Sequence, residues 1–185
     1  MIRLSMFFLA FLMAAHVYGQ QQFTTKSRRA EESMKEALQQ YQLRDHQKAL
    51  EKVNEALERD DEFIEAVILK GQIFEEQQRY DQAIEQYRRA IALNVDFYPR
   101  ILYNTGRLEY HTGRYKEARG HFVRYRDRED TGPIQDAEVK RYIRSCDFAM
   151  EQLQNPVPFS PRGLGESVNS PYHEYWPSIS ADGQT

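Results

Sequence analysis

The feature that most constrains this chain is a repeat that returns every 34 to 35 residues. Ala37 and Gly71 are 34 residues apart, and Gly71 and Gly106 are 35 apart. The segments that start at these small residues read ALQQYQLRDHQKALEKVNEAL, GQIFEEQQRYDQAIEQYRRAI and GRLEYHTGRYKEARGHFVRYR. A period of this length is typical of stacked supersecondary units, in which each unit buries its apolar face against its neighbours.

Further positions recur in phase within the three segments. A second small residue stands at the same place in each, and large residues flank it on both sides; the small ones are Ala49, Ala83 and Ala118, and the large ones are His46, Tyr80, Tyr115, Val53, Tyr87 and Phe122. Apolar residues within a segment follow a helical period, which predicts helix–turn–helix hairpins. The small residues then mark where two backbones approach, so a larger side chain at Gly71 or Ala83 should push the helices apart.

This pattern resembles the tetratricopeptide repeat family. The resemblance covers residues 27–154 and implies an all-α solenoid of about three repeats, closed by a capping helix and followed by an extended tail. The first repeat is the least typical, because Arg44 and His46 stand where a glycine and an aromatic residue are usual. We expect helix N-caps at Asp60 or Asp61 and at Asp81. The capping helix after Pro133 has an apolar side formed by Ile134, Ala137, Val139, Tyr142, Ile143, Cys146, Phe148, Ala149 and Leu153.

The family resemblance also implies a binding groove lined by the first helix of each hairpin. Carried over position by position, the groove falls on Glu31, Met34, Leu38, Tyr41, Glu65, Ile68, Gln72, Glu75, Arg100, Tyr103, Arg107 and Tyr110. Some relatives hold a terminal carboxylate with lysine and asparagine here, but this chain has Met34, Leu38, Ile68 and Gln72 instead. As partner-binding residues we predict Tyr41, Glu65, Gln72, Glu75, Arg100, Tyr103, Arg107 and Tyr110, since Arg and Tyr concentrate binding energy. The alternative is that they are solvated or stacking residues of a helix face.

The N-terminus predicts export. Arg3 precedes an apolar stretch of about fourteen residues, from Leu4 to Val17, and Gly19 offers a cleavage point. The alternative is an uncleaved anchor, but a membrane-spanning helix needs about twenty apolar residues. We therefore expect a signal peptide at residues 1–19, a leader at 20–26 and a location in the periplasm, with association to the outer membrane as a further expectation.

Composition and side-chain chemistry exclude several classes of function. The formal charge of -3 and the absence of a basic block argue against nucleic acid. The histidines after Gly19 form no helical metal pair, and no phosphate-binding loop or nucleophile motif is present, so we expect no metal, cofactor, small-molecule substrate or enzymatic activity. The single cysteine, Cys146, cannot form an internal disulfide, and it is expected to be a buried apolar residue instead of a reactive thiol.

The C-terminal sequence differs from the repeats. Residues 155–167 form a proline- and glycine-rich linker, and residues 168–185, VNSPYHEYWPSISADGQT, resemble the opening of a TolB-like propeller blade. The matching residues are Asn169, Ser170, Glu174, Tyr175, Pro177, Ser178, Ile179, Asp182 and Gly183. The second strand of such a blade is missing, so we expect the chain to be the N-terminal portion of a longer protein.

The order of these parts is similar to Gram-negative envelope proteins that continue through a propeller into an OmpA-like, peptidoglycan-binding domain. It implies a non-catalytic protein–protein interaction scaffold of the cell envelope, within an outer-membrane-associated assembly or secretion machine. Its partners would be envelope proteins, and any link to peptidoglycan would run through the missing domains. The alternative is the N-terminal fragment of an envelope hydrolase whose catalytic residues lie beyond Thr185.

Overall fold

The computed structural model describes residues 23–128 and 136–156. The chain divides into two compact units, Met1–Met150 and Glu151–Thr185, and the account below concerns the first. The predicted signal peptide, most of the proline- and glycine-rich linker and the blade-like tail lie outside the described residues. So does Ile134, the first residue of the apolar side predicted for the capping helix.

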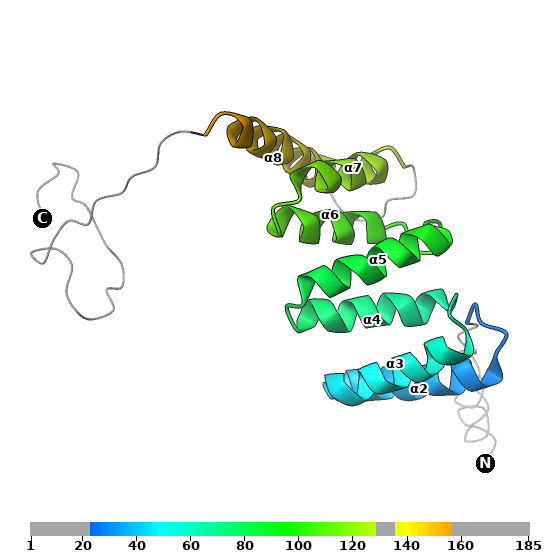
Figure 1. The fold of residues 1–185 in the computed structure, drawn as a ribbon. Helices are drawn as coiled ribbons and strands as arrows, with labels where there is room; N and C mark the ends of the chain where they lie inside the picture. Colours follow the sequence, from blue (N-terminus) through cyan, green and yellow to red (C-terminus); the bar gives the residue numbers. More distant parts are fainter. Residues whose placement is uncertain (1–22, 129–135, 157–185) are drawn as a thin grey trace, which may run out of the picture. The chain divides into compact units, whose positions relative to one another are not determined.

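Seven α-helices and no strand are found in the described ranges, which confirms the all-α prediction (Figure 1). The helices are α2 (Arg28–Gln42), α3 (His46–Arg59), α4 (Ile64–Glu76), α5 (Tyr80–Asn94), α6 (Ile101–His111), α7 (Tyr115–Arg126) and α8 (Asp136–Gln154). None of them is long and apolar enough to cross a membrane.

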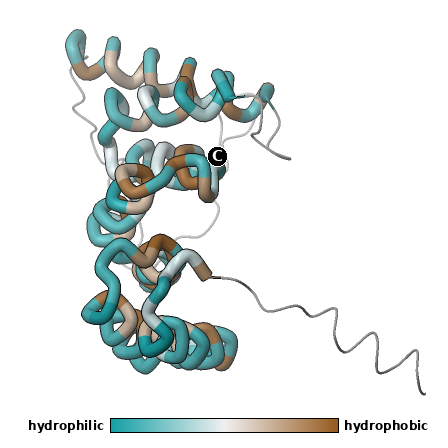
Figure 2. Tube along the Cα trace, turned by 90° about the vertical axis from the view of Figure 1, so that its right-hand side faces the viewer, coloured by the Kyte–Doolittle hydropathy of each residue, from teal (hydrophilic) through white to brown (hydrophobic). Residues whose placement is uncertain are grey.

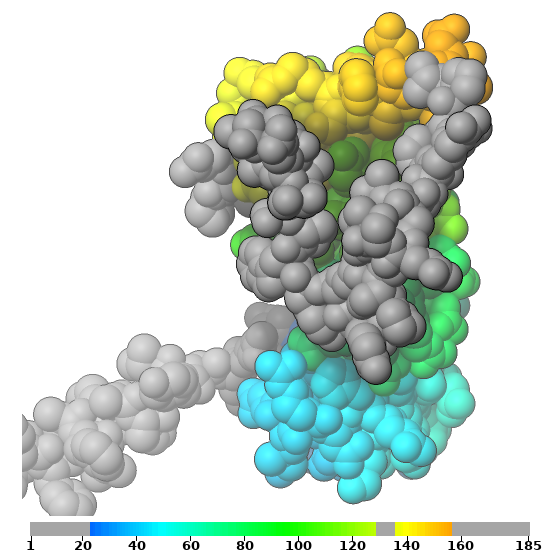
Figure 3. Space-filling model, turned by 90° about the vertical axis from the view of Figure 1, so that its left-hand side faces the viewer, coloured from blue at the N-terminus to red at the C-terminus, as the bar shows by residue number. Residues whose placement is uncertain are grey.

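Consecutive helices pair into three hairpins, α2 with α3, α4 with α5 and α6 with α7. The hairpins stack in chain order through smaller contacts of α3 with α4 and of α5 with α6. Figure 3 shows the first hairpin and α8 at opposite ends of this stack. Hydrophobic and hydrophilic residues alternate along the helices at short intervals (Figure 2), as amphipathic helices with one buried face require.

The small residues of the repeat lie where the two helices of a hairpin meet, as predicted. A Cβ atom on Gly71 would lie 2.5 Å from Cε1 of Tyr87, and one on Gly106 would lie 3.1 Å from Cε1 of Phe122. Both ring residues belong to the second helix of the same hairpin and are almost fully buried. The second set of small residues is also buried, at Ala49, Ala83 and Ala118. Glycine is therefore needed at position 71 because the ring of Tyr87 fills the space a side chain would take.

Each hairpin turns in the same way. The residue after the C-cap has a positive φ, at Arg44 (61°), Gln78 (59°) and Gly113 (78°). The next amide then donates to a carbonyl five residues back, from Asp45 to Gln40, from Arg79 to Phe74 and from Arg114 to Glu109. This is the Schellman motif, in which a left-handed residue lets the last helical carbonyls find donors.

The predicted N-caps were wrong. Asp60 is the C-cap of α3, and α4 begins after Phe63 without a side-chain cap because Phe63 is fully buried and fixes the entry of the helix by packing. Asp81 lies inside the first turn of α5 and pairs with Arg114 at 2.7 Å. Among helices α2 to α7, side-chain caps are found at Ser27, which accepts from the Ala30 amide, and at Asp45, which accepts from the Lys48 amide.

Helix α8 covers the last hairpin with a narrower apolar side than the sequence predicted. Val139, Ile143 and Cys146 are buried, and the ring of Tyr142 stacks on Phe122 at a centroid distance of 4.7 Å. Burial raises the pKa of the Cys146 thiol to about 11, as expected for a packing residue. Phe148 and Leu153, by contrast, are 64% and 68% exposed, so the predicted apolar side is only partly buried.

Candidate partner-binding groove

A pocket of about 350 Å³ opens between the first helices of the first two hairpins, α2 and α4, and we call it the α2–α4 groove. Its lining consists of Phe23, Met34, Leu38, Glu65, Ile68, Leu69, Gln72, Phe97 and Tyr98. Five of these residues, Met34, Leu38, Glu65, Ile68 and Gln72, were placed in a groove by the repeat pattern. Its walls are mainly apolar with two polar side chains, which is the usual make-up of a ligand pocket.

Sequence reasoning did not point to the remaining walls. Phe23 comes from the segment before α2, while Phe97 and Tyr98 come from the connection between α5 and α6. This connection is longer than the one between α3 and α4, as the repeat spacing predicted. Two adjacent aromatic residues in the connection between two helices were the available signal.

Tyr41 lies in a bonded cluster beside the groove and not in its lining. Its hydroxyl donates to Glu76 Oε1 at 2.5 Å, and Arg44 donates to the other oxygen of this carboxylate at 2.9 Å. Burial, together with the bond to Glu76, raises the pKa of Tyr41 to about 12. The cluster ties the first hairpin to α4.

Glu75 and Arg107 form an ion pair between α4 and α6. The other Glu75 oxygen accepts from the hydroxyl of Tyr87 at 2.8 Å, so the carboxylate joins three helices. Burial raises the pKa of Tyr87 well above its usual value, and the neighbouring Glu75 adds to the shift. The two predicted groove residues are therefore partners of each other across the hairpin boundary.

The tyrosines of the third repeat lie beneath α8. Tyr103 is only 6% exposed; its hydroxyl donates to Glu138 Oε1 at 2.9 Å, and its ring contacts Phe122, Tyr125 and Tyr142. Tyr110 is half-buried, with its ring 5.4 Å from that of Tyr142. Arg100 is exposed just before α6 and does not line the α2–α4 groove. The structure thus brings Glu65 and Gln72 together, and it separates them from the Arg and Tyr residues of the third repeat.

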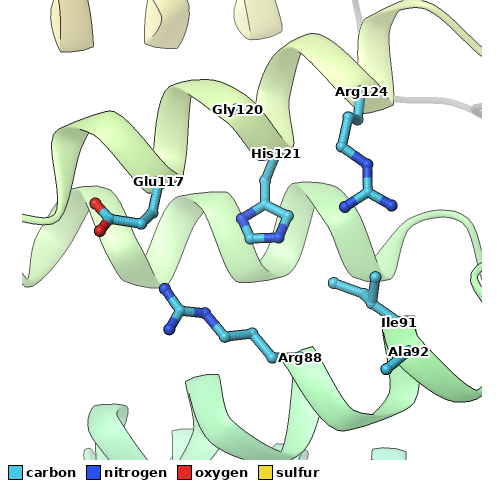
Figure 4. A pocket seen from close by; sticks show the side chains of 7 residues that line it. All are labelled: Arg88, Ile91, Ala92, Glu117, Gly120, His121 and Arg124. Carbon is cyan, nitrogen blue, oxygen red and sulfur yellow. The ribbon is translucent and has the colours of Figure 1, made fainter.

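A second pocket, of about 640 Å³, lies between α5 and α7 (Figure 4). It is lined by Arg88, Ile91, Ala92, Glu117, Gly120, His121 and Arg124. Two of the lining side chains, Arg88 and His121, bind Glu109 of α6, which is fully buried. Arg88 Nη2 is 2.7 Å from Glu109 Oε1, and His121 Nδ1 is 2.6 Å from Oε2.

The arrangement around Glu109 is a structural clamp, since both carboxylate oxygens are used in holding α5 and α7 to α6. It was not predicted, although Glu109 is the single carboxylate in the sequence of residues 101–111. Across the residues that the structure describes, no group of three His, Cys, Asp or Glu side chains is placed to hold a metal ion.

Comparisons with known proteins agree with this architecture. A sequence model of the tetratricopeptide repeat family matches residues 34–94 and 68–133, together more than half of the chain. No curated protein matches it in sequence.

Several solved structures are similar at low sequence identity. The TPR2B domain of yeast Sti1, in a structure described as its complex with pHsp70, has a TM-score of 0.56 at 17% identity and covers 66% of this chain and 98% of that one. The Sgt2 TPR domain of Aspergillus fumigatus has a TM-score of 0.55 at 16% identity, over 77% and 95%. SycD, the type III secretion translocator chaperone of Yersinia enterocolitica, has 0.56 at 16%, over 65% and 85%. At these identities the similarity shows the fold alone.

Proposed function

Because the chain belongs to the tetratricopeptide repeat family, we propose that it is a protein-interaction scaffold that holds an extended segment of a partner protein in the α2–α4 groove. Tetratricopeptide proteins are protein-interaction scaffolds. The α2–α4 groove has the apolar and polar lining that binding a protein segment requires. The observation that carries the proposal is the pocket itself, in which the polar Glu65 and Gln72 lie beside the partly exposed Leu38 and Phe97, the latter 41% exposed.

The chemistry of the groove favours apolar anchors. The structures of yeast Sti1 and of Spaghetti are described as complexes with pHsp70 and with an HSP90 peptide. Their family's carboxylate clamp has no counterpart here, since Met34, Leu38 and Ile68 cannot bind a carboxylate. Gln72 is the remaining polar group at those positions, and it makes no side-chain hydrogen bond to the described residues. The partner segment is therefore held by its apolar side chains, while Gln72 and Glu65 fix its orientation.

The scaffold is proposed to be non-catalytic, as tetratricopeptide modules generally are. The buried Glu109 does not change this, because Arg88 and His121 occupy both of its oxygens. A buried carboxylate with an arginine on one oxygen and a histidine on the other stabilises the fold.

We further propose that the scaffold works in the Gram-negative periplasm, within an outer-membrane-associated assembly or secretion machine. The signal-like start, the order of the chain's parts and the resemblance of residues 168–185 to a TolB-like blade support this location. N-terminal sequencing of the mature protein is expected to begin at Gln20. An N-terminus at Met1 would contradict export by a cleaved signal.

Site-directed photocross-linking tests the groove. A photoreactive phenylalanine analogue is placed at Gln72 or Phe97 of the full chain in its source cells. We expect adducts with the same partner protein from both positions, and peptide mapping should locate them in one short segment of that partner. Glu85 is the matched control because it is exposed on α5 outside the groove lining. Adducts from position 85 equal to those from 72 and 97 would refute the groove as the binding surface.

A further inference from the structure

The segment before α2 is fastened to the α2–α4 groove. The backbone amide of Thr24 donates to Glu65 Oε1 at 2.9 Å, and its hydroxyl donates to Glu65 Oε2 at 2.5 Å. The next residue, Thr25, donates its hydroxyl to Asp60 Oδ2 at 2.5 Å. Glu65 is thereby fully engaged by a residue that lies 41 positions away in the chain.

Phe23 supplies the apolar part of this contact. Its ring meets the ring of Phe63 edge to face, with the centroids 5.6 Å apart and an interplanar angle of 80°. It is half-buried against the core and lines the groove next to Met34, Leu38 and Ile68. An aromatic side chain and a hydroxyl residue thus act together at one end of the groove.

Helix α2 does not depend on residues 23–26 for its N-cap. Residues 23–26 precede α2 and are not helical, and α2 already has its own N-cap, Ser27, whose side chain accepts from the Ala30 amide. The contacts of Phe23 and Thr24 are those of an extended peptide on a receptor: a side chain in a pocket and a main-chain donor on a fixed acceptor. Thr24 is exposed to water, so its bonds can exchange with a competitor.

We propose that Phe23 and Thr24 are an intramolecular occupant of the groove, and that the partner displaces them with a segment of the same chemistry. That segment is extended and carries an aromatic residue followed by serine or threonine, which place a ring against Phe63 and two donors on Glu65. This inference rests on the proposed function. It adds the class of partner segment, and it makes displacement of Phe23 and Thr24 the step that limits binding. While the chain's own segment occupies the groove, a partner can bind only to the fraction of molecules whose groove is empty. The apparent affinity for the partner is reduced by that fraction.

The test uses the full chain and a synthetic peptide of residues 20–27, QQQFTTKS, with an acetylated N-terminus. A Phe23→Ala, Thr24→Val double variant empties the groove while leaving the Ser27 cap in place. Amide NMR titration follows the resonances of Leu38, Ile68 and Gln72. We expect saturable shifts in the double variant and an apparent affinity for the peptide about tenfold higher than in the wild-type chain.

Two controls complete the experiment. A peptide with alanine in place of its phenylalanine is expected to lose binding, and Glu65→Ala in the double variant is expected to do the same. An unchanged helical circular dichroism spectrum shows that each variant is folded, and the single variant Thr24→Val replaces the double one if it is not.

Equal affinity of the wild-type chain and the emptied variant for the peptide would overturn the proposal, and so would an absence of binding to both. Such a failure leaves the cross-linking test intact, because cross-links at Gln72 do not depend on Phe23. The two hypotheses therefore fail separately.

Discussion

Gln78 occupies the left-handed position of the second hairpin turn, where Gly113 stands in the third. A side chain with Cβ is strained at such a φ by about 1 kcal/mol, whereas glycine is not. The same position in the first turn is Arg44, whose guanidinium is bound to Glu76. The left-handed backbone is thus set by the repeat geometry and not by the residue that occupies it.

Replacing Gln78 with glycine should therefore stabilise the protein. Gln78→Gly removes the strain of a side chain at positive φ, while the greater freedom of glycine in the unfolded chain offsets part of the gain. We therefore expect the free energy of unfolding to rise by about 0.5 kcal/mol. Thermal unfolding by circular dichroism measures the effect. Gln77→Gly is the matched control, because Gln77 has a φ of -81° and no strain to lose, and it should destabilise. A lower melting temperature for Gln78→Gly than for the wild-type chain would contradict the argument.

The candidate site could be predicted from the sequence only in part. Met34, Leu38, Ile68 and Gln72, which the family resemblance assigned to a groove, do line one pocket in the structure, but whether they bind a partner stays a prediction. The roles of Tyr103 and Arg107 depend on Glu138 and Glu75, which lie in other helices. A sequence pattern within one repeat does not predict which carboxylate accepts from which donor in another hairpin. Whether Tyr103 and Arg107 contact a partner stays a prediction.

The two helices of the second hairpin, α4 and α5, pack closely at Gly71. A Cβ at this position would overlap the Tyr87 ring, which is buried and held through its hydroxyl by Glu75 and so has no free direction in which to move. Overpacking of this kind costs about 1–3 kcal/mol, which exceeds the helix propensity gained by alanine.

Gly71→Ala should accordingly destabilise the fold, and Gly120→Ala should not. Gly120 is also inside a helix, α7, but nothing lies within 4 Å of its added Cβ, so the same change gains up to about 1 kcal/mol in helix propensity. Urea unfolding midpoints measured side by side compare the two. If both variants shifted the midpoint in the same direction, close packing at Gly71 would not be the cause.

At the level of helices, the sequence predicted the fold well because small residues, helical period and turn spacing all agree with the repeat. It was less successful at helix starts. Helix α4 starts after Phe63, which is fully buried and makes no side-chain cap. The nearby Asp60 and Asp61 were therefore misleading as predicted caps. The apolar side of α8 was also predicted too wide, since amphipathicity indicates which face is apolar but not how much of it is buried, and Phe148 and Leu153 are exposed.

The described helices form a stack in which each hairpin contacts mainly the next one. Stability in such an array is approximately a sum of hairpin and nearest-neighbour terms, so weakening one interface opens the array locally. The Glu109 clamp belongs to the interface between the second and third hairpins, because Arg88 lies on α5 and His121 on α7.

Glu109→Ala should therefore loosen the C-terminal part of the stack first. The change removes the acceptor of Arg88 and His121 and leaves a cavity. The Arg88 side chain is 45% exposed and can be hydrated, so we expect the free energy of unfolding to fall by about 2 kcal/mol. Hydrogen exchange with mass spectrometry should show protection falling about thirtyfold in α6 and α7, with α2 and α3 unchanged. Glu109→Gln, which keeps the shape and one acceptor, should have a smaller effect in the same helices. An equal loss of protection in α2 would mean that the hairpins unfold as one unit and that the nearest-neighbour description does not hold for this protein.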